Sequence, residues 1–139
     1  MGRSRGGFGT EIHAVVTGLG LPAVLTVTAG QRADVSQAEA LLEAVPAEAA
    51  VEVVIADKGY DSEAVVAKVE ERGAEAVIPT LSTRAVQREI DTERYKDRNL
   101  AERFWRRVKE FRRVATRYEK TARNFLAFVH VASIMVLLR

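Results

Sequence analysis

Cysteine is absent from the 139 residues of this chain, which excludes disulfide bonds and thiolate metal sites. The absence fits a reducing cytoplasm, where we expect the protein to reside. Residues 1–9 contain arginine and glycine but no apolar core, so they are not a secretory signal peptide. The longest apolar stretch, residues 125–138, contains His130 and Ser133 and is too short to span a bilayer. We therefore expect no association with a membrane.

Common catalytic motifs are also missing. The sequence has no Ser-His-Asp arrangement, no phosphate-binding glycine loop and no spacing of zinc ligands. His13 lies in a β-rich run and His130 on an apolar helix, where both are better explained as structural residues than as ligands. No repeat or linker divides the chain. We therefore expect residues 1–139 to form one domain or part of one, with residues 1–9 as a flexible arm.

The net charge of +2 hides an asymmetry along the chain. Residues 94–123 contain twelve Lys or Arg against four Asp or Glu, and the rest of the chain is acidic. A concentrated positive segment in an acidic chain favours a polyanionic partner. A solvated helix face explains the same charges equally well.

Apolar periodicity and turn residues predict an α/β protein. The predicted order is a hairpin, a helix, a strand, a second helix, a second strand and two long helices. Ser36 with Glu39 suits a capping box for the first helix, and Asp61 suits the cap of the second, which Gly73 ends. This order favours a mixed sheet with antiparallel strands first and parallel strands afterwards. The expected ranges are 12–17 and 23–28 for the hairpin, then 36–45, 51–56, 61–72 and 76–79, and finally 97–113 and 121–138.

Asp57 follows residues 51–56, an apolar run of the kind found in strands buried on both faces. In open α/β sheets, ligands collect at the carboxyl ends of the strands. A carboxylate at that end can bind a divalent cation through oxygen. Because Asp57 and Gly59 also suit an ordinary turn, this run by itself leaves both interpretations open.

A second group of residues is spaced for one face of a helix. Tyr95, Arg98, Glu102 and Lys109 share that face with Arg106 and Arg113, opposite Leu100, Phe104, Val108 and Phe111. Glu102 is a single acid on an otherwise cationic face, as expected of a metal-binding carboxylate surrounded by phosphate-binding cations. Pairing of Glu102 with Arg98 or Arg106, four residues away, explains the same pattern. Trp105 borders the face, where packing in the core is favoured over stacking on a base.

These residues resemble the tyrosine–arginine–glutamate–lysine signature of bacterial insertion-sequence DDE transposases. In this chain the signature is Tyr95, two residues, Arg98, three residues, Glu102, six residues and Lys109. The start GRSRGG, the run ADKGYDS and the segment RNFLAFVHVAS resemble one group of these enzymes, insertion sequence family five. The resemblance covers nearly the whole chain.

The resemblance implies an RNase H-like α/β fold, in which a mixed sheet is flanked by helices, and a site of two aspartates and one glutamate. Asp57 would be the second acid and Glu102 the third, both catalytic and both metal ligands. Two Mg²⁺ ions, which Mn²⁺ can replace, would support cleavage and strand transfer of DNA. The DNA partners would be transposon ends and target, at the nucleoid in the bacterial cytoplasm. The residues expected to contact DNA are Tyr95, Arg98, Arg106, Lys109 and Arg113.

The first aspartate of the family pattern has no counterpart in this chain. The family carries it on a strand before the hairpin, whereas Glu11 opens a hairpin strand and Asp34 precedes a helix. We therefore expect the C-terminal part of a catalytic domain, whose sheet lacks its first, central strand and exposes strand edges. The expected protein partners are an upstream transposase portion carrying the first aspartate and a second copy of the chain.

Three functions are open at this point. The chain is the C-terminal part of a transposase that acts with its upstream portion, a non-catalytic DNA-binding fragment that modulates transposition, or a decayed remnant. Metal-dependent nicking distinguishes the first from the second, whereas salt-sensitive DNA binding is expected of both.

Overall fold

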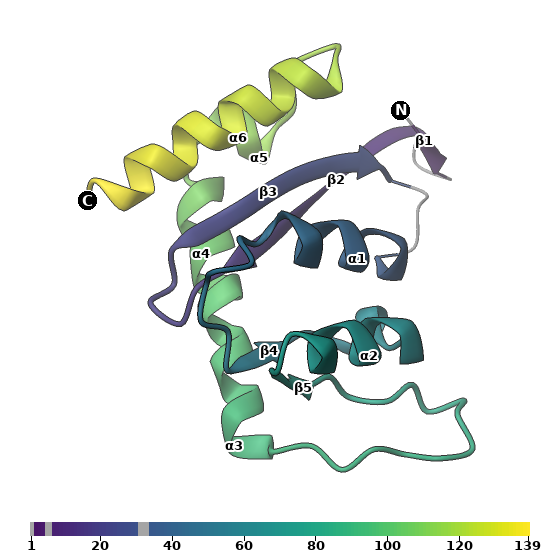
Figure 1. Cartoon of the computed structure of the whole chain (residues 1–139). Helices are drawn as coiled ribbons and strands as arrows, with labels where there is room; N and C mark the ends of the chain where they lie inside the picture. The colour runs from purple at the N-terminus through teal and green to yellow at the C-terminus, as the bar shows by residue number, and fades with distance from the viewer. Residues whose placement is uncertain (1, 5–6, 31–33) are drawn as a thin grey trace. The chain divides into compact units, whose positions relative to one another are not determined.

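The computed structural model describes residues 2–4, 7–30 and 34–139 of the chain (Figure 1). The chain divides into two compact units. Unit 1 comprises Met1–Arg32 and Leu100–Arg139, and unit 2 comprises Ala33–Asn99. The sequence does not predict this division, because no linker-like composition lies at either boundary. Each unit has a hydrophobic core of its own.

Unit 1 combines an antiparallel sheet with helices. The hairpin predicted from two β-rich runs is confirmed, since β2 and β3 pair antiparallel with a bulge between Val15 and Val16. Gly20 lies in the turn with φ +76°, a conformation that favours glycine. The described elements of unit 1 are β1 (Gly2–Ser4), β2 (Gly7–Val16), β3 (Pro22–Ala29), α4 (Asn99–Lys109), α5 (Arg112–Ala115) and α6 (Ala122–Leu137).

One face of the β2–β3 hairpin forms the core of unit 1. Ile12 lies opposite Val27 and Ala14 opposite Leu25, so alternate residues of both strands point to the same side. They pack against buried side chains of the helices, and α6 lies along β3 (Figure 1). The buried helix residues are Phe104, Val108, Val114, Phe125, Val129, Ala132 and Val136. Burying a side chain of this size stabilises the fold by about 1.5–3 kcal/mol.

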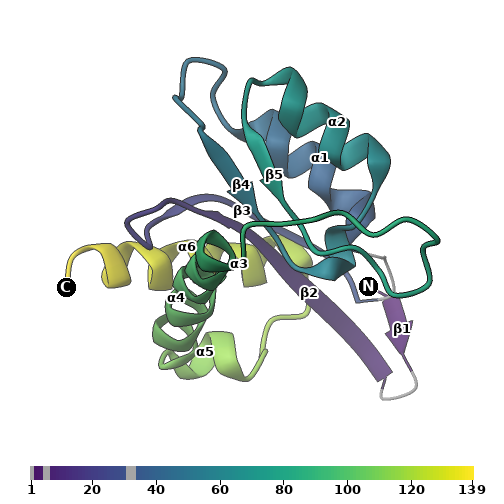
Figure 2. The same ribbon diagram turned by 90° about the horizontal axis from the view of Figure 1, so that it is seen from below.

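Unit 2 is built around a parallel pair of strands, as predicted. Val53, Val54 and Ile55 pair with Glu75, Ala76 and Val77, and α1 and α2 lie side by side next to this pair (Figure 2). The first strand is shorter than expected and only partly buried, not buried on both faces. The described elements are α1 (Val35–Ala44), β4 (Val53–Ile55), η1 (Lys58–Tyr60), α2 (Glu63–Glu71), β5 (Glu75–Val77), α3 (Thr92–Tyr95) and η2 (Lys96–Arg98).

The mixed α/β class is therefore confirmed, with antiparallel strands first and parallel strands afterwards. The strands form two separate sheets, and among the described residues β4 pairs with β5 alone. In the expected arm, Gly2–Ser4 pairs with the start of β2, while Met1, Arg5 and Gly6 lie outside the described residues. No helix in the described part of the chain is long and apolar enough to cross a bilayer.

The predicted capping box at Ser36 and Glu39 is wrong. α1 begins at Val35, and Asp34 occupies the cap position with a backbone that is already helical, at φ −52° and ψ −39°. Ser36 therefore lies in the first turn of the helix. The side chain of Asp34 makes no capping hydrogen bond to α1.

The predicted long helix over residues 97–113 is also wrong at both ends. Helical structure begins at Thr92, because Asp91 accepts hydrogen bonds from the N–H groups of Glu93 and Arg94. It passes through η2 into α4 and stops at Lys109. Phe111 is extended, at φ −79° and ψ 110°, and its side chain packs against the core of unit 1. The final helix matches its prediction within a residue, with Thr121 as its cap.

Asp61 does not cap α2 as predicted. Ser62 occupies the cap position, and the fully buried Asp61 side chain turns toward a later segment of unit 2. It accepts hydrogen bonds from Leu81 N–H and Arg84 Nε, each at 2.8 Å, and pairs with Arg88. Local sequence cannot reveal these partners, since they lie 20 to 27 residues away.

Burial by itself would raise the pKa of Asp61. The Leu81 N–H and the guanidinium groups of Arg88 and Arg84 outweigh burial and hold the pKa of this carboxyl below its ordinary value. A carboxyl with a lowered folded-state pKa stabilises the fold above its unfolded-state pKa. That stabilisation is lost as the pH falls through the folded-state pKa.

Replacing Asp61 by Asn keeps the size of the side chain but removes the charge that faces Arg84 and Arg88. We expect the free energy of unfolding at pH 7 to fall by about 3 kcal/mol, as when a buried ion pair is broken. Urea unfolding of both proteins from about pH 7 to about pH 2 should show this difference shrinking as the wild-type carboxylate is protonated.

Glu63→Gln is the matched control, because Glu63 pairs with the same Arg84 at 3.3 Å but its side chain is 88% exposed. Its effect on the free energy of unfolding should stay below about 0.5 kcal/mol. Equal losses for the two variants would contradict the structural role of Asp61.

Candidate functional site

Asp57 lies just past the carboxyl end of β4, as predicted. The strand ladder continues one residue further, with Ala56 N–H donating to Val77 O at 3.3 Å. Asp57 is extended and half-buried, and its Oδ1 accepts a hydrogen bond from Gly59 N–H at 2.8 Å. Among the described residues, no lysine or arginine forms a salt bridge with Asp57. Within that part of the chain, Asp57 thus differs from Asp61, whose charge is paired with Arg84 and Arg88.

Two carboxylate oxygens lie near Gly59. A Cβ atom at this position would lie 2.9 Å from Asp57 Oδ1 and 3.1 Å from Asp34 Oδ2. Carboxylate oxygens are the ligands that Mg²⁺ prefers in proteins, so these donors fit the metal that the resemblance implies. The sequence identifies Asp34 only as an acid before a helix, so its position near Gly59 is known from the tertiary structure alone.

Tyr95 and Arg98 are the other two predicted site residues that lie in unit 2. Tyr95 ends α3 and Arg98 ends η2, and both are half-buried. The guanidinium carbon of Arg98 lies 5.9 Å from the centre of the Tyr95 ring, within range of a cation–π interaction. The tyrosine and arginine of the signature are thus in contact.

Helix α4 carries the remaining signature residues on its exposed side. Phe104 and Val108 are 1% and 0% exposed, which leaves Glu102, Arg106 and Lys109 at the surface. Glu102 is the single acid among the eleven residues of α4, and it lies in the first turn. This confirms the two-faced helix predicted from the spacing of apolar residues.

Arg113 departs from the predicted stripe. It lies in α5, beyond the break after Lys109, and its Nη1 is 3.2 Å from Glu119 Oε1. Its guanidinium carbon also lies 4.7 Å from the centre of the Phe128 ring. The cation of Arg113 is therefore partly neutralised by Glu119 within unit 1.

The predicted site residues are divided between the two units. A single site that combines Asp57 with Glu102 stays a prediction. Unit 2 holds Asp57, Tyr95 and Arg98, while unit 1 holds Glu102, Arg106, Lys109 and Arg113.

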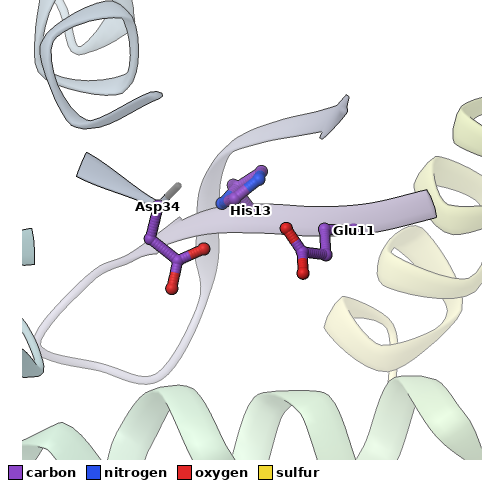
Figure 3. Close-up of side chains that lie close together, drawn as sticks. All are labelled: Glu11, His13 and Asp34. Carbon is purple, nitrogen blue, oxygen red and sulfur yellow. The ribbon is translucent and has the colours of Figure 1, made fainter. Parts of the chain in front are cut away.

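Glu11, His13 and Trp105, which the sequence also singles out, lie on β2 and α4. His13 is 3% exposed, and its Nε2 lies 2.9 Å from Thr28 Oγ1. Glu11 and His13 are two residues apart on β2 and share one face of the strand (Figure 3). Trp105 packs against the core of unit 1, with its ring centre 5.1 Å from that of Phe104.

Comparisons with known proteins assign the chain to a family. The family model described as "Transposase DDE domain" matches residues 2–137. A Brucella ovis protein named "Putative transposase for insertion sequence element IS6501" is 39% identical over 131 residues, which are 94% of this chain and 98% of that protein. No solved structure matches the chain. With nearly its whole length matched, the chain belongs to the family of bacterial insertion-sequence DDE transposases.

Proposed function

We propose that this chain is the C-terminal part of a transposase catalytic domain that cleaves DNA and transfers its strands. The observation that carries the proposal is Glu102, the single acid on the exposed cationic side of α4, in a chain matched by the transposase family over residues 2–137. The proposed fold is RNase H-like, a mixed sheet flanked by helices.

Asp57 and Glu102 are the proposed metal ligands. Asp57 supplies a carboxylate at the carboxyl end of β4 that no lysine or arginine of the described residues pairs with. The chemistry that two Mg²⁺ ions supply when bound is activation of water or a 3′-hydroxyl for in-line attack on a phosphodiester. Mn²⁺ is expected to replace Mg²⁺, since both are hard cations that bind carboxylates.

The exposed cations of α4 are the proposed DNA contacts. Arg106 and Lys109 project from the same helix as Glu102, so they would bind phosphates next to the reacting strand. Arg98 and Tyr95, which contact each other, are also proposed to contact DNA. Arg113 would add a further contact once DNA competes with Glu119 for its guanidinium group.

An upstream transposase portion is the proposed protein partner. Among the residues that the structure describes, β4 pairs with β5 alone, so its other edge would accept a strand. A strand carrying the family's first aspartate would place a further acid beside Asp57. A second copy of the chain is also proposed, because a transposase must handle two transposon ends.

Asp57→Asn and Glu102→Gln should each abolish metal-dependent nicking when the chain is joined to its upstream portion. We expect a loss of at least about 100-fold in the rate, because each variant removes a ligand without changing the size of the side chain. The measurement is nicking of a DNA duplex that carries the transposon end, with Mg²⁺ and with Mn²⁺.

Glu52→Gln and Glu110→Gln are matched controls for this test. Glu52 is an exposed residue just before β4, at the opposite end from Asp57, and Glu110 is exposed just after α4 and pairs with Arg139. Both should leave nicking unchanged. Full activity of either the Asp57 or the Glu102 variant would refute the assignment, and DNA binding without nicking by the wild type would favour the non-catalytic alternative.

Arg106→Gln combined with Lys109→Gln should weaken DNA binding mainly at low salt. Each lost phosphate contact should reduce the slope of log K against log salt by about 1. The measurement is the affinity for a duplex at several salt concentrations. Lys96→Gln is the control, because Lys96 already pairs with Glu93 at 2.7 Å. An unchanged slope in the double variant would show that these residues do not contact phosphate.

A further inference from the structure

Residues 111–124 comprise α5, the segment that follows it and the first turn of α6, all within unit 1 (Figure 2). They contain five Lys or Arg and a single acid, Glu119. The side chain of Glu119 is only 7% exposed. The exposed charged residues of this range are Arg112, Arg113, Lys120 and Arg123. Burial of the acid therefore leaves a surface whose exposed charges are all positive, which favours a polyanionic partner.

The segment between α5 and α6 places charged side chains inside and an aromatic side chain outside. Residues 117–120 alternate in burial, so that Arg117 and Glu119 face the interior of unit 1. Tyr118 and Lys120 face solvent instead, and Tyr118 is 56% exposed. The usual order is the reverse, because charged side chains are buried less often than tyrosine.

The side chain of Arg117 holds this segment against β2 and α6. It donates hydrogen bonds to Thr10 Oγ1 and, at 2.9 Å, to Glu119 O, and its guanidinium carbon lies 5.3 Å from the centre of the Phe125 ring. Arg117 Nη2 and Glu119 Oε2 are buried without a hydrogen-bond partner among the described residues, which costs free energy. Stability therefore does not explain this arrangement. Such departures from the usual pattern are expected at functional surfaces.

The exposed ring and its neighbouring cation suit an unpaired strand of nucleic acid. An aromatic ring stacks on a base of any sequence, and a lysine binds phosphate. Bases inside a duplex are already stacked on both faces, so an exposed ring has access only to an unpaired base. Lys120 is two residues from Tyr118 on the same side of the segment, so it would reach a phosphate of the same strand.

We infer that Tyr118 and Lys120 bind single-stranded DNA, with Tyr118 stacked on an unpaired base and Lys120 paired with a phosphate. The inference rests on the proposed function, in which the chain acts on DNA whose strands are cut and transferred. It adds a contact for unpaired DNA to the phosphate contacts proposed for α4.

Binding of a fluorescently labelled thymidine oligonucleotide, about 16 nucleotides long, to the full chain tests this inference by anisotropy. Tyr118→Ala should bind the oligonucleotide at least about 5-fold more weakly than the wild type. Tyr118→Phe keeps the ring and should bind like the wild type. The matched control is Leu138→Ala, because Leu138 is 78% exposed at the opposite end of α6. Binding of a blunt duplex of the same length should be the same for all these variants.

Tyr118→Leu provides a second variant, with an apolar side chain but no aromatic ring. It should bind the oligonucleotide as weakly as Tyr118→Ala does. Circular dichroism checks that each variant is folded. Wild-type affinity of Tyr118→Leu would overturn the inference even if Tyr118→Ala failed to fold.

Lys120→Gln should reduce the slope of log K against log salt for the oligonucleotide by about 0.7. Lys96→Gln is the control, since Lys96 already pairs with Glu93 at 2.7 Å. An unchanged slope in Lys120→Gln would show that Lys120 binds no phosphate of the strand, and would overturn its role.

The outcomes separate this inference from the proposed function. Wild-type affinity of Tyr118→Ala for the oligonucleotide would overturn the role of Tyr118, and so would equal losses for the oligonucleotide and the duplex. Either result would leave the proposed function intact, because that function is tested by the nicking activity of Asp57→Asn and Glu102→Gln. Failure of the wild type to bind either DNA would contradict both.

Discussion

Burial of Phe104 and Val108 against the β2–β3 hairpin determines which side chains of α4 face solvent. A helix turns by about 100° per residue, so fixing these two positions leaves Glu102, Arg106 and Lys109 on the other side. The acid and the cations proposed to act on DNA are exposed because the apolar face of their helix is held in a core. The hairpin contributes to the proposed chemistry through this packing.

Asp57 and Asp61 lie only four residues apart in the sequence, but their surroundings in unit 2 differ. Asp61 is fully buried, and its charge is balanced by Arg84, Arg88 and the N–H of Leu81. Asp57, four residues earlier, is half-buried and bonds to Gly59 N–H. Asp61 thus joins the segment after β5 to the start of α2, while Asp57 is partly exposed to solvent. The same residue type serves stability in one case and is suited to metal binding in the other.

The two pairs of strands differ in length and in the packing that supports them. β2 and β3 form a complete antiparallel hairpin with a packed apolar face, whereas β4 and β5 form a short parallel pair of three residues each. A two-stranded sheet has little stability without packing, and here α1 and α2 supply it. An added strand next to β4 would extend the pair that carries Asp57. This is the physical basis for expecting that the chain acts with a further transposase segment.

The sequence by itself determined the order and type of the main elements, because apolar periodicity and turn residues are local. It also determined the two-faced character of α4, which depends on spacing within a single helix. Residue contacts across long stretches of chain were decided only by the tertiary structure. Asp61 was expected at a helix cap but binds arginines more than twenty residues later, and the carboxylate of Asp34, expected only before a helix, lies near Gly59. Both positions depend on the packing of α1 and the segment after β5 around unit 2, which no local pattern encodes.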